Sequence, residues 1–424
     1  MVTASIIFIV TYILMLSLDK YKHIIALISG IVFILTGILP LQSVLGAIDF
    51  NVLLMMVGTM GLVSLFIESK MPNLIADFII SKTSTTMMTA VCLSLFAGII
   101  SAFVDNVATV LMIAPVALEV CKKLKTNPVP FIICIAVSSN LQGAATLVGD
   151  TTAIMLGSAC NLSFMDFFFY KGKPSMFFIV ELGALLTAGV IAFIFRKERD
   201  KIEKSNEFTK VKDFVPTVLL LLNIILLVAS SFIEDKPDIT NGVIGCTLFT
   251  IGATYDAVRD KQLKSVWEHI VNIDFKTLAF LTGLFLMIGG ISEAGVISSI
   301  ANLLSSVGGN NTFLLYTVIV FASVLISAFI DNIPYVATML PIIAGIATNL
   351  GIDATPLYFG LLCGATLGGN ITPIGASANI AGIGILRNAN YQVTTKDFCR
   401  ISIPLTLFAV VPAYIIIWLL YGVH

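Results

Sequence analysis

The sequence predicts an all-α polytopic membrane protein, and three observations support this fold class. The chain of 424 residues is 58% hydrophobic and 12% charged, whereas soluble domains carry about 25% charged residues. Its mean hydropathy is +1.01. Apolar stretches of about 20 residues, the length of a helix that spans a bilayer, recur along the chain. Several motifs of the first half also return in the second half.

Charged residues predict how these stretches are threaded through the membrane. The polar linker 196–213 contains seven Lys and Arg residues, so the positive-inside rule places it in the cytoplasm. The segments 87–121 and 312–348 are expected to be re-entrant hairpins. With this threading only Lys171, Lys173 and Lys236 lie outside, and both termini are expected outside a plasma (inner) membrane. The expected crossings are 3–17, 23–41, 50–67, 128–160 and 174–195, then 214–233, 239–257, 274–291, 355–387 and 400–421.

Three pairs of segments define an internal repeat. Residues 48–69 match residues 273–294, residues 143–151 match residues 369–377, and an Asp-Asn motif forms the third pair. Each half has an odd number of expected crossings, so the two halves are expected in opposite orientations. Inverted repeats with interrupted helices are typical of secondary transporters, whose site lies near the membrane midplane. The expected organisation is a first repeat 1–195, the linker 196–213 and a second repeat 214–424.

The Asp-Asn motif places charged residues inside apolar segments. It occurs in SAFVDNVATVLMIAP, which contains Asp105, and in SAFIDNIPYVATMLP, which contains Asp331. A charged aspartate at the centre of a membrane helix costs about 2.5–3.5 kcal/mol on insertion scales. At a hairpin tip these side chains can cap the next helix, whose positive N-terminus then faces the midplane. The two aspartates are therefore either helix caps alone or also ion-binding groups, and their symmetric occurrence favours the second interpretation.

A second element in each half is rich in small and polar residues. NLQGAATLVGDTT lies in the segment 128–160, and GATLGGNITPIGASAN lies in the segment 355–387. Gly, Thr, Ser and Asn are typical of an unwound stretch that lines a cavity. Close helix packing is an alternative, and a phosphate-binding loop is a weaker one. Glu181 is a candidate second proton site or a cavity-facing group. No basic residue falls at the predicted midplane.

These motifs together resemble the ion transporter superfamily, specifically its citrate-transporter-like, ArsB/NhaD group and the pink-eyed dilution (P protein) branch. The resemblance covers nearly the whole chain and includes NPVP at 127–130. It implies an elevator-type fold, often in a homodimer, with substrate bound between hairpin tips and helix breaks. The sequence GDTTA at 149–153 departs from the family's GDPPN, and Tyr335 stands where the first half has Thr109. The implied site residues are Asp105, Asn106, Thr109, Thr146, Gly149, Asp150, Thr151, Asp331, Asn332, Thr372, Gly375, Ser377 and Asn379.

The expected function is secondary active transport of a small inorganic ion or small organic anion. Asp105, Asp150 and Asp331 would bind the coupling ion, sodium or a proton, and no other cofactor is expected. Ion/proton antiport is preferred over sodium-coupled carboxylate transport, other anion transport or arsenite efflux. Without a basic residue at the predicted midplane, a polyanion would depend on helix dipoles and bound sodium, and the cysteines show no clustered spacing for a soft metalloid such as arsenite. A channel is a further alternative, because a channel and a coupled carrier can share one fold. An intramembrane aspartyl protease is a remote alternative, because its two carboxylates must share one site. A net charge of −1 gives no sign of nucleic-acid binding.

Overall fold

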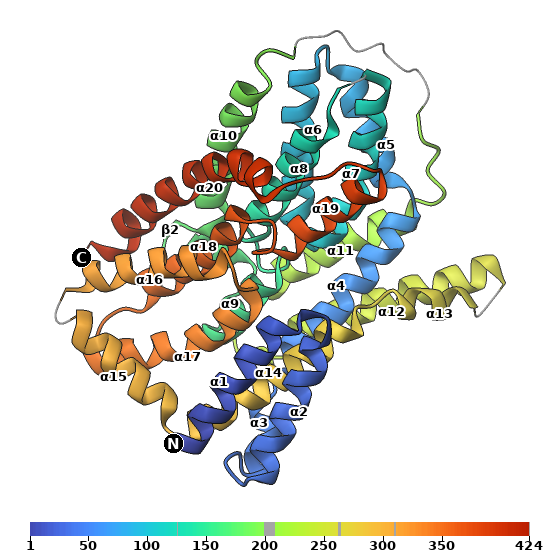
Figure 1. Ribbon diagram of the computed structural model, residues 1–424. Coiled ribbons are helices and arrows are strands. Elements are labelled where there is room, and N and C mark those ends of the chain that lie inside the picture. Colours follow the sequence, from blue (N-terminus) through green and yellow to red (C-terminus); the bar gives the residue numbers. More distant parts are fainter. Residues whose placement is uncertain (125, 199–207, 262–263, 309–310, 424) are drawn as a thin grey trace.

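The computed structural model describes residues 1–124, 126–198, 208–261, 264–308 and 311–423. The protein is mostly helical, which confirms the predicted fold class at this level (Figure 1). One short antiparallel strand pair, β1 (Phe169–Tyr170) with β2 (Lys173–Pro174), was not predicted. Half of the predicted linker, residues 199–207, lies outside the described residues.

The described part of the first half contains ten α-helices and three 3-10 turns, with the strand pair before its last helix. They are α1 (Val2–Ser17), η1 (Asp19–Tyr21), α2 (Lys22–Leu35), η2 (Leu41–Ser43), α3 (Val44–Ala47), α4 (Phe50–Glu68), α5 (Met71–Lys82), α6 (Thr86–Ser101), α7 (Asn106–Leu124), α8 (Pro128–Gly143), α9 (Thr151–Ala159), η3 (Met165–Phe167) and α10 (Met176–Ile194).

The second half follows a closely similar order. Its elements are α11 (Val215–Ser230), α12 (Thr240–Asp260), α13 (Lys264–Val271), α14 (Phe275–Glu293), α15 (Val296–Gly308), α16 (Thr312–Ser327), α17 (Asn332–Leu350), α18 (Thr355–Gly368), η4 (Gly369–Ile371), α19 (Ser377–Asn388), α20 (Thr395–Ile417) and η5 (Trp418–Gly422).

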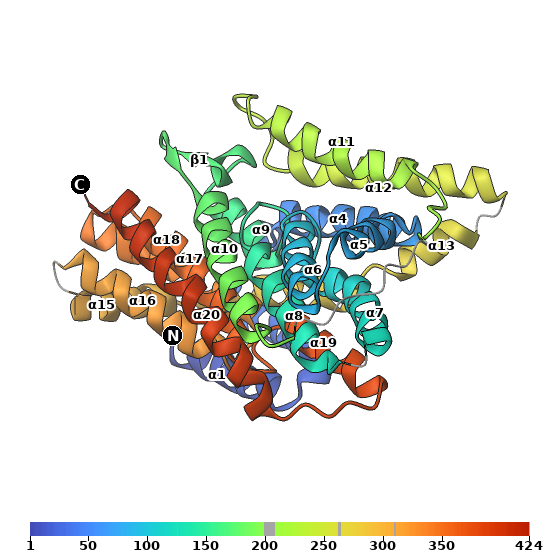
Figure 2. The ribbon, with the colours of Figure 1, turned by 90° about the horizontal axis from the view of Figure 1, so that it is seen from above.

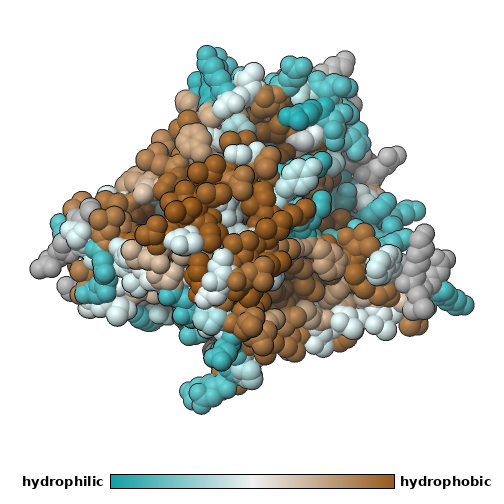
Figure 3. Space-filling view, turned by 60° about the horizontal axis from the view of Figure 1, so that its bottom comes forward, coloured by the Kyte–Doolittle hydropathy of each residue, from teal (hydrophilic) through white to brown (hydrophobic). Residues whose placement is uncertain are grey.

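Five helices among the described residues are long and apolar enough to cross a membrane. They start at Phe50, Met176, Phe275, Asn332 and Thr395, and several shorter apolar helices accompany them. A broad hydrophobic area covers the middle of the face in Figure 3, and hydrophilic residues gather around its rim. This distribution is the one that a surrounding bilayer requires.

Helices α4 to α9 recur as α14 to α19, with closely matching lengths. Helices α4 and α14 each have 19 residues, α6 and α16 each have 16, and α7 and α17 each have 19. The first pair also starts in the same way, because an aspartate caps both of its members: Asp49 accepts from the Val52 amide, and Asp274 accepts from the Thr277 amide. The repeat seen in the sequence is therefore also a repeat of local structure.

Close packing of glycines joins the two halves on one side of the molecule. Helix α4 lies along α12, and α2 lies along α14. A Cβ atom on Gly58 would lie 2.4 Å from the Gly245 carbonyl carbon, and one on Gly283 would lie 2.4 Å from the Ala26 carbonyl carbon. Only glycine permits so close an approach of two helices. Helices α11, α12 and α13 lie on one side of the molecule, opposite α15, α16 and α17 (Figure 2).

Candidate functional site

Each Asp-Asn motif lies in a turn between two helices and caps the second of them. Asp105 Oδ2 accepts a hydrogen bond from the Ala108 amide at 3.0 Å, at the start of α7. Asp331 Oδ1 accepts from the Ile333 amide at 3.2 Å, at the start of α17. Both aspartates therefore act as helix caps. Each has a second carboxylate oxygen whose surroundings differ between the two halves.

Each turn is held against a helix break in the same half. The Thr146 hydroxyl donates to the Ala102 carbonyl, and the Thr372 hydroxyl donates to the Ala328 carbonyl. In both pairs the donor follows the acceptor by 44 residues. The break between α8 and α9 thus fits the first turn as the break between α18 and α19 fits the second.

Two glycines allow this fit. A Cβ atom on Gly149 would lie 2.5 Å from the Gly143 oxygen and 2.8 Å from the Ala102 oxygen. A Cβ atom on Gly375 would lie 2.5 Å from the Gly369 oxygen and 2.8 Å from the Ala328 oxygen. Backbone cannot give way as a flexible side chain can, so both positions require glycine.

We expect Gly149→Ala to destabilise the protein by about 1–3 kcal/mol, the usual cost of overpacking, because the added methyl group displaces the break. Gly189→Ala is the matched control, since a Cβ there meets no atom within 4 Å. The measurement is the thermal unfolding midpoint of each purified variant. Equal midpoints for the two variants would contradict the described packing.

Asp150 connects the first break to the second turn. It caps α9, with Oδ1 accepting from the Thr151 amide at 2.7 Å and Oδ2 accepting from the Thr152 hydroxyl at 2.9 Å. Oδ2 also accepts from Asn332 Nδ2 at 3.4 Å. No hydrogen bond joins Asp150 to another carboxylate among the described residues. This differs from a pair of carboxylates that share a proton.

A chain of buried amides crosses between the halves, and the sequence analysis selected Asn106 of this chain but not Asn140 or Asn370. Asn106 Nδ2 donates to Asn140 Oδ1 at 2.9 Å. Asn140 Nδ2 donates to the Thr366 carbonyl at 2.7 Å and to Asn370 Oδ1 at 3.1 Å. Asn140 lies in α8, whose residues from Phe131 to Gly143 are all buried. The sequence held one signal for this chain of amides. Asn140 lies in a segment whose other residues are mostly apolar, and a buried asparagine must find hydrogen-bond partners.

An acidic cavity of about 640 Å³ opens beside these elements. Its lining includes the first helical residue of each of four helices: Asn106 of α7, Thr151 of α9, Asn332 of α17 and Ser377 of α19. The described lining has no Lys, Arg, His or Cys, but it has four carboxylates. These are Glu68, Asp105, Asp150 and Asp274. Carboxylates and backbone dipoles of both halves therefore face one space.

The structure divides the thirteen site residues selected from the sequence into three groups. Six line the acidic cavity: Asp105, Asn106, Asp150, Thr151, Asn332 and Ser377. Six others do not line it. Four of these hold the breaks: Thr146, Gly149, Thr372 and Gly375. Asn379 Nδ2 donates to the Gly369 and Thr372 carbonyls, and the Thr109 hydroxyl is buried without a described partner. The last, Asp331, lines a neighbouring cavity of about 210 Å³. Glu181 lies in α10 and lines neither cavity.

A basic residue lies beside one of the selected site residues. The sequence places no basic residue at the predicted midplane and assigns Lys22 to a cytoplasmic segment, and in the structure Lys22 Nζ lies 2.7 Å from Asp331 Oδ2. Lys22 begins α2. The contact arises from tertiary packing, which carries the start of α2 to the second turn.

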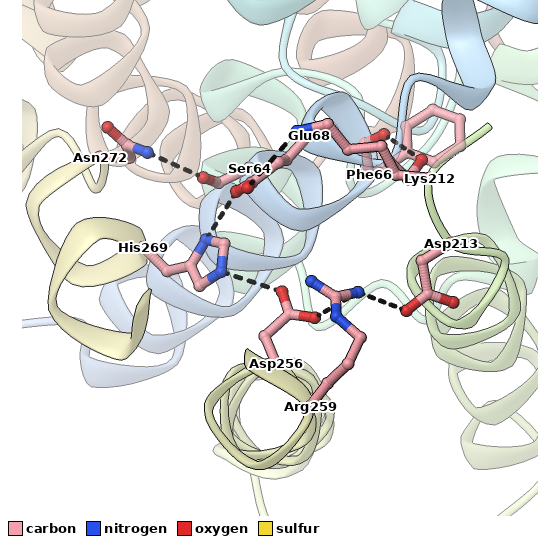
Figure 4. A network of polar contacts seen from close by, with 10 residues as sticks. Ser64, Phe66, Glu68, Lys212, Asp213, Asp256, Arg259, His269 and Asn272 are labelled. Carbon is pink, nitrogen blue, oxygen red and sulfur yellow. Dashed lines mark hydrogen bonds and ion pairs between the residues drawn. The ribbon is translucent and has the colours of Figure 1, made fainter. Parts of the chain in front are cut away.

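A polar network (Figure 4) lies beside the acidic cavity and shares Ser64, Glu68 and Asn272 with its lining. His269 of α13 is buried, with Nε2 3.0 Å from Asp256 Oδ2 and Nδ1 3.8 Å from Glu68 Oε2. Asn272 Nδ2 donates to Ser64 Oγ at 3.2 Å. The network therefore joins α13 to α4 and α12 beside the cavity.

Arg259 extends this network to the segment that precedes α11. Its Nη1 lies 2.6 Å from Asp213 Oδ2 and 3.1 Å from Asp256 Oδ1. Partial burial acts to raise the pKa of the Asp213 carboxyl, but hydrogen bonds from the Val215 amide and the Arg259 guanidinium outweigh it and hold that pKa below its usual range. The ionised carboxylate therefore contributes to stability.

We expect Asp213→Asn to lower stability at pH 7 by about 1 kcal/mol or less, the scale of a partly exposed ion pair. Because the folded pKa is lowered, the wild-type advantage is complete above the unfolded pKa of about 3.9 and disappears as the pH falls through the folded pKa. Thermal midpoints from pH 7 to pH 3 test this, with exposed Asp235→Asn as control. A difference that grows on acidification would contradict the pairing.

Comparison with known proteins identifies the family. Residues 7–364 match the sequence profile described as citrate transporter, CitMHS. The chain belongs to this family. It is 31% identical to a 46 kDa membrane protein of Mycobacterium leprae over 99% of each chain. It is 30% identical to an uncharacterized transporter of Mycobacterium tuberculosis, over 100% of this chain and 99% of that protein.

The family resemblance seen in the sequence is confirmed by the P protein of Homo sapiens. It is 26% identical over 86% of this chain and 53% of the P protein, so this chain spans about half of that protein. Two solved transporters share the fold. YdaH of Alcanivorax borkumensis aligns with a TM-score of 0.64 at 15% identity, over 90% of this chain and 88% of that one. MtrF of Neisseria gonorrhoeae aligns with a TM-score of 0.56 at 14% identity, over 97% and 85%. The protein is therefore a membrane transporter of the citrate transporter family.

Proposed function

We propose that this transporter is a secondary active carrier that exchanges a small ion for protons, with sodium or a proton as the coupling ion. The observation that carries the proposal is the acidic cavity, where Asp105 and Asp150 face one space whose described lining has no basic side chain. Hard monovalent and divalent cations are bound by carboxylate and carbonyl oxygens. A charge in such a position is retained for a function rather than for stability.

We assign cation binding to the first half of the site. Asp105 and Asp150 belong to the first turn and the first break, and Asn332 of the second half hydrogen-bonds to Asp150. Asp105 Oδ2 accepts from the start of α7, so a sodium ion would take Asp105 Oδ1. At Asp150 it would share Oδ2 with the Thr152 hydroxyl and the Asn332 amide. The same carboxylates can carry a proton instead, and this would make sodium and protons competitors for one site.

A second candidate function is cation-coupled transport of a small carboxylate, and one feature of the second half favours it. Helix α19 starts at Ser377 without a side-chain cap, whereas Asp150 caps the equivalent helix α9. The start of a helix attracts anions because its amides are unpaired and its dipole is positive there. An anion near Ser377 with a cation near Asp150 would place both charges in one cavity. The family description names citrate.

Alternating access follows if the two repeats are inverted in the membrane, as the sequence predicts. The polar network beside the acidic cavity includes Lys212 and Asp213. Both belong to the linker 196–213, which the positive-inside rule assigns to the cytoplasm. The acidic cavity would then be the inward-facing access route. The resemblance to elevator-type carriers further implies a homodimer in the plasma membrane.

Cysteine labelling tests this topology. Cysteines introduced at 196–213 should react with a membrane-impermeant reagent only from the cytoplasm, and cysteines at either end of this chain only from outside. The expectation rests on the threading that concentrates Lys and Arg on one side. Labelling of residues near Met1 from the cytoplasm would give the first half an even number of crossings and would rule out inverted repeats.

Transport assays separate the candidate functions. Proteoliposomes with an internal pH dye receive sodium, lithium, citrate, succinate, sulfate or arsenite under an imposed pH gradient. Proton movement driven by sodium or lithium alone supports ion/proton antiport, and movement that needs citrate or succinate supports carboxylate transport. Flux of an ion down its own gradient with no coupled proton or sodium movement would identify a channel and overturn the proposal.

A further inference from the structure

The ion pair of Lys22 with Asp331 distinguishes the second turn from the first. Lys22 Nζ lies 2.7 Å from Asp331 Oδ2, and the two side chains are 28% and 19% exposed. The other carboxylate oxygen, Oδ1, caps α17. Both oxygens of Asp331 are therefore engaged, one by a helix start and one by an ammonium group.

The position of Lys22 is unfavourable for its own helix. It is the first residue of α2, and a cation at a helix N-terminus is repelled by the helix dipole. The pair thus does not stabilise α2 through its dipole. Its favourable contact is with the aspartate at the start of α17, whose carboxylate is in turn well placed at a helix N-terminus.

Asp105 has the equivalent place in the first half but different surroundings. One oxygen caps α7, and the described residues give Asp105 no ion pair. Asp105 lines the acidic cavity, whereas Asp331 lines the smaller cavity of about 210 Å³ together with Lys22. Ser377 contributes to both cavities, so the start of α19 adjoins the cavity of Asp105 and also the cavity of Asp331.

Helix α1 strengthens the contact with the second turn. The Tyr12 hydroxyl donates to the Pro334 carbonyl at 2.7 Å and lies 2.6 Å from the Thr338 hydroxyl. Tyr12 also lines the smaller cavity. The helix pair α1 and α2 therefore contacts α17 at two points, the ion pair at its start and the tyrosine near its first turn.

We propose that Lys22 is a tethered cation that occupies at Asp331 the position that a free cation occupies at Asp105. The inference rests on the proposed cation binding at the first half. It assigns a coupling ion to one of the two equivalent carboxylates and reserves the other for the protein's own ammonium group. Removing the tether opens a new site for a monovalent cation at Asp331.

Chemical rescue tests the inference with a free ammonium in place of the tethered one. Purified wild type, Lys22→Ala, Lys22→Arg and the double variant Lys22→Ala/Asp331→Asn are titrated with n-propylammonium chloride, sodium chloride and, for ionic strength, choline chloride. The readout is the thermal unfolding midpoint. The concentration of n-propylammonium that raises the midpoint of Lys22→Ala should be at least about tenfold lower than the concentration that raises the wild-type midpoint. A tenfold difference corresponds to about 1.4 kcal/mol in the free energy of binding.

The controls locate the effect at Asp331. Lys22→Arg keeps a charged partner and should respond to n-propylammonium as wild type does, and the double variant should show no specific response beyond choline. An equal response of Lys22→Ala and wild type would overturn the inference. If Lys22→Ala does not fold, Lys22→Gln gives the same comparison, since it also removes the charge.

The outcome is separable from that of the proposed function. The alkylammonium response of Lys22→Ala depends on Asp331 alone, whereas the sodium response of the wild type depends on Asp105 and Asp150. If sodium does not raise the wild-type midpoint but proteoliposomes still show proton movement, the coupling ion is a proton. This result would not contradict the pairing of Lys22 with Asp331. Absence of the alkylammonium response refutes the tether whichever ion is coupled.

Discussion

Asp105→Asn should abolish coupled transport while the protein remains folded. Asparagine keeps the side-chain oxygen that accepts from the Ala108 amide, so the start of α7 keeps its cap. The substitution removes the charge that faces the acidic cavity. The loss of a charged ligand weakens binding of the coupling ion by about 1.5–3 kcal/mol, which is about tenfold or more. The loss of the titrating carboxylate also leaves no group at this position that can exchange a proton for the ion, so coupled movement should stop.

The measurement is cation-driven proton movement in proteoliposomes, together with the thermal midpoint. Asp49→Asn is a matched control, since Asp49 caps α4 by accepting from the Val52 amide at 3.0 Å and does not line the acidic cavity. Transport that persists in Asp105→Asn at the level of Asp49→Asn would reduce Asp105 to a helix cap.

Asp150→Asn and Ser377→Ala should have separate effects, because they alter opposite halves of one cavity. Asp150→Asn removes a carboxylate that caps α9 and accepts from Thr152 and Asn332. It should shift the sodium and pH dependence of transport. Ser377→Ala removes a hydroxyl at the uncapped start of α19 and should weaken the apparent affinity for the cargo by about 1–3 kcal/mol.

The two affinities are measured for each variant, with the cargo that the transport panel identifies and with sodium and protons. Thr152→Val is a useful companion to Asp150→Asn, since it keeps the carboxylate but removes one hydrogen bond to it. It should change the ion dependence less than Asp150→Asn does. If Asp150→Asn alters only cargo affinity and Ser377→Ala alters only ion dependence, the proposed division between the halves is reversed.

Asp331 is now expected to behave differently from Asp105, although the two motifs read alike. Asp331→Asn leaves the Lys22 ammonium without its carboxylate partner, and removing one member of a partly buried pair is more harmful than removing both. The sequence alone predicts the same effect for both aspartates. The structure predicts that loss of function in Asp331→Asn is partly relieved when Lys22 is also replaced.

Repeated spacing explains why much of the site was predictable. The caps join neighbouring residues, and the contacts between turn and break join residues within one half. The 44-residue separation of Thr146 from Ala102 recurs for Thr372 and Ala328. Such repeated spacing is visible in one sequence. The helical class and the family follow from hydropathy and from the motifs, because membrane-buried backbone must form helices or closed barrels.

Long-range packing explains what was missed. Asn140 contacts Thr366 and Asn370 across 226 and 230 positions, and no local pattern states which buried amides will meet. Lys22 and Asp331 are 309 positions apart, and a lysine beside a short turn carries no sign that it will reach a second turn in the other half.

The sequence by itself determined the membrane class, the repeat, the family and the two turn-and-break elements, because hydropathy and turn chemistry act over a few residues. Only the tertiary structure decided that six of the predicted site residues share one acidic cavity, that five hold the breaks or the core amide contacts, and that Asp331 is paired. These outcomes depend on how the starts of α7, α9, α17 and α19 converge and on where α2 packs. Every helix start carries a similar dipole. Only the packing of the helices against one another decides which helix starts meet and which charged side chains face one another.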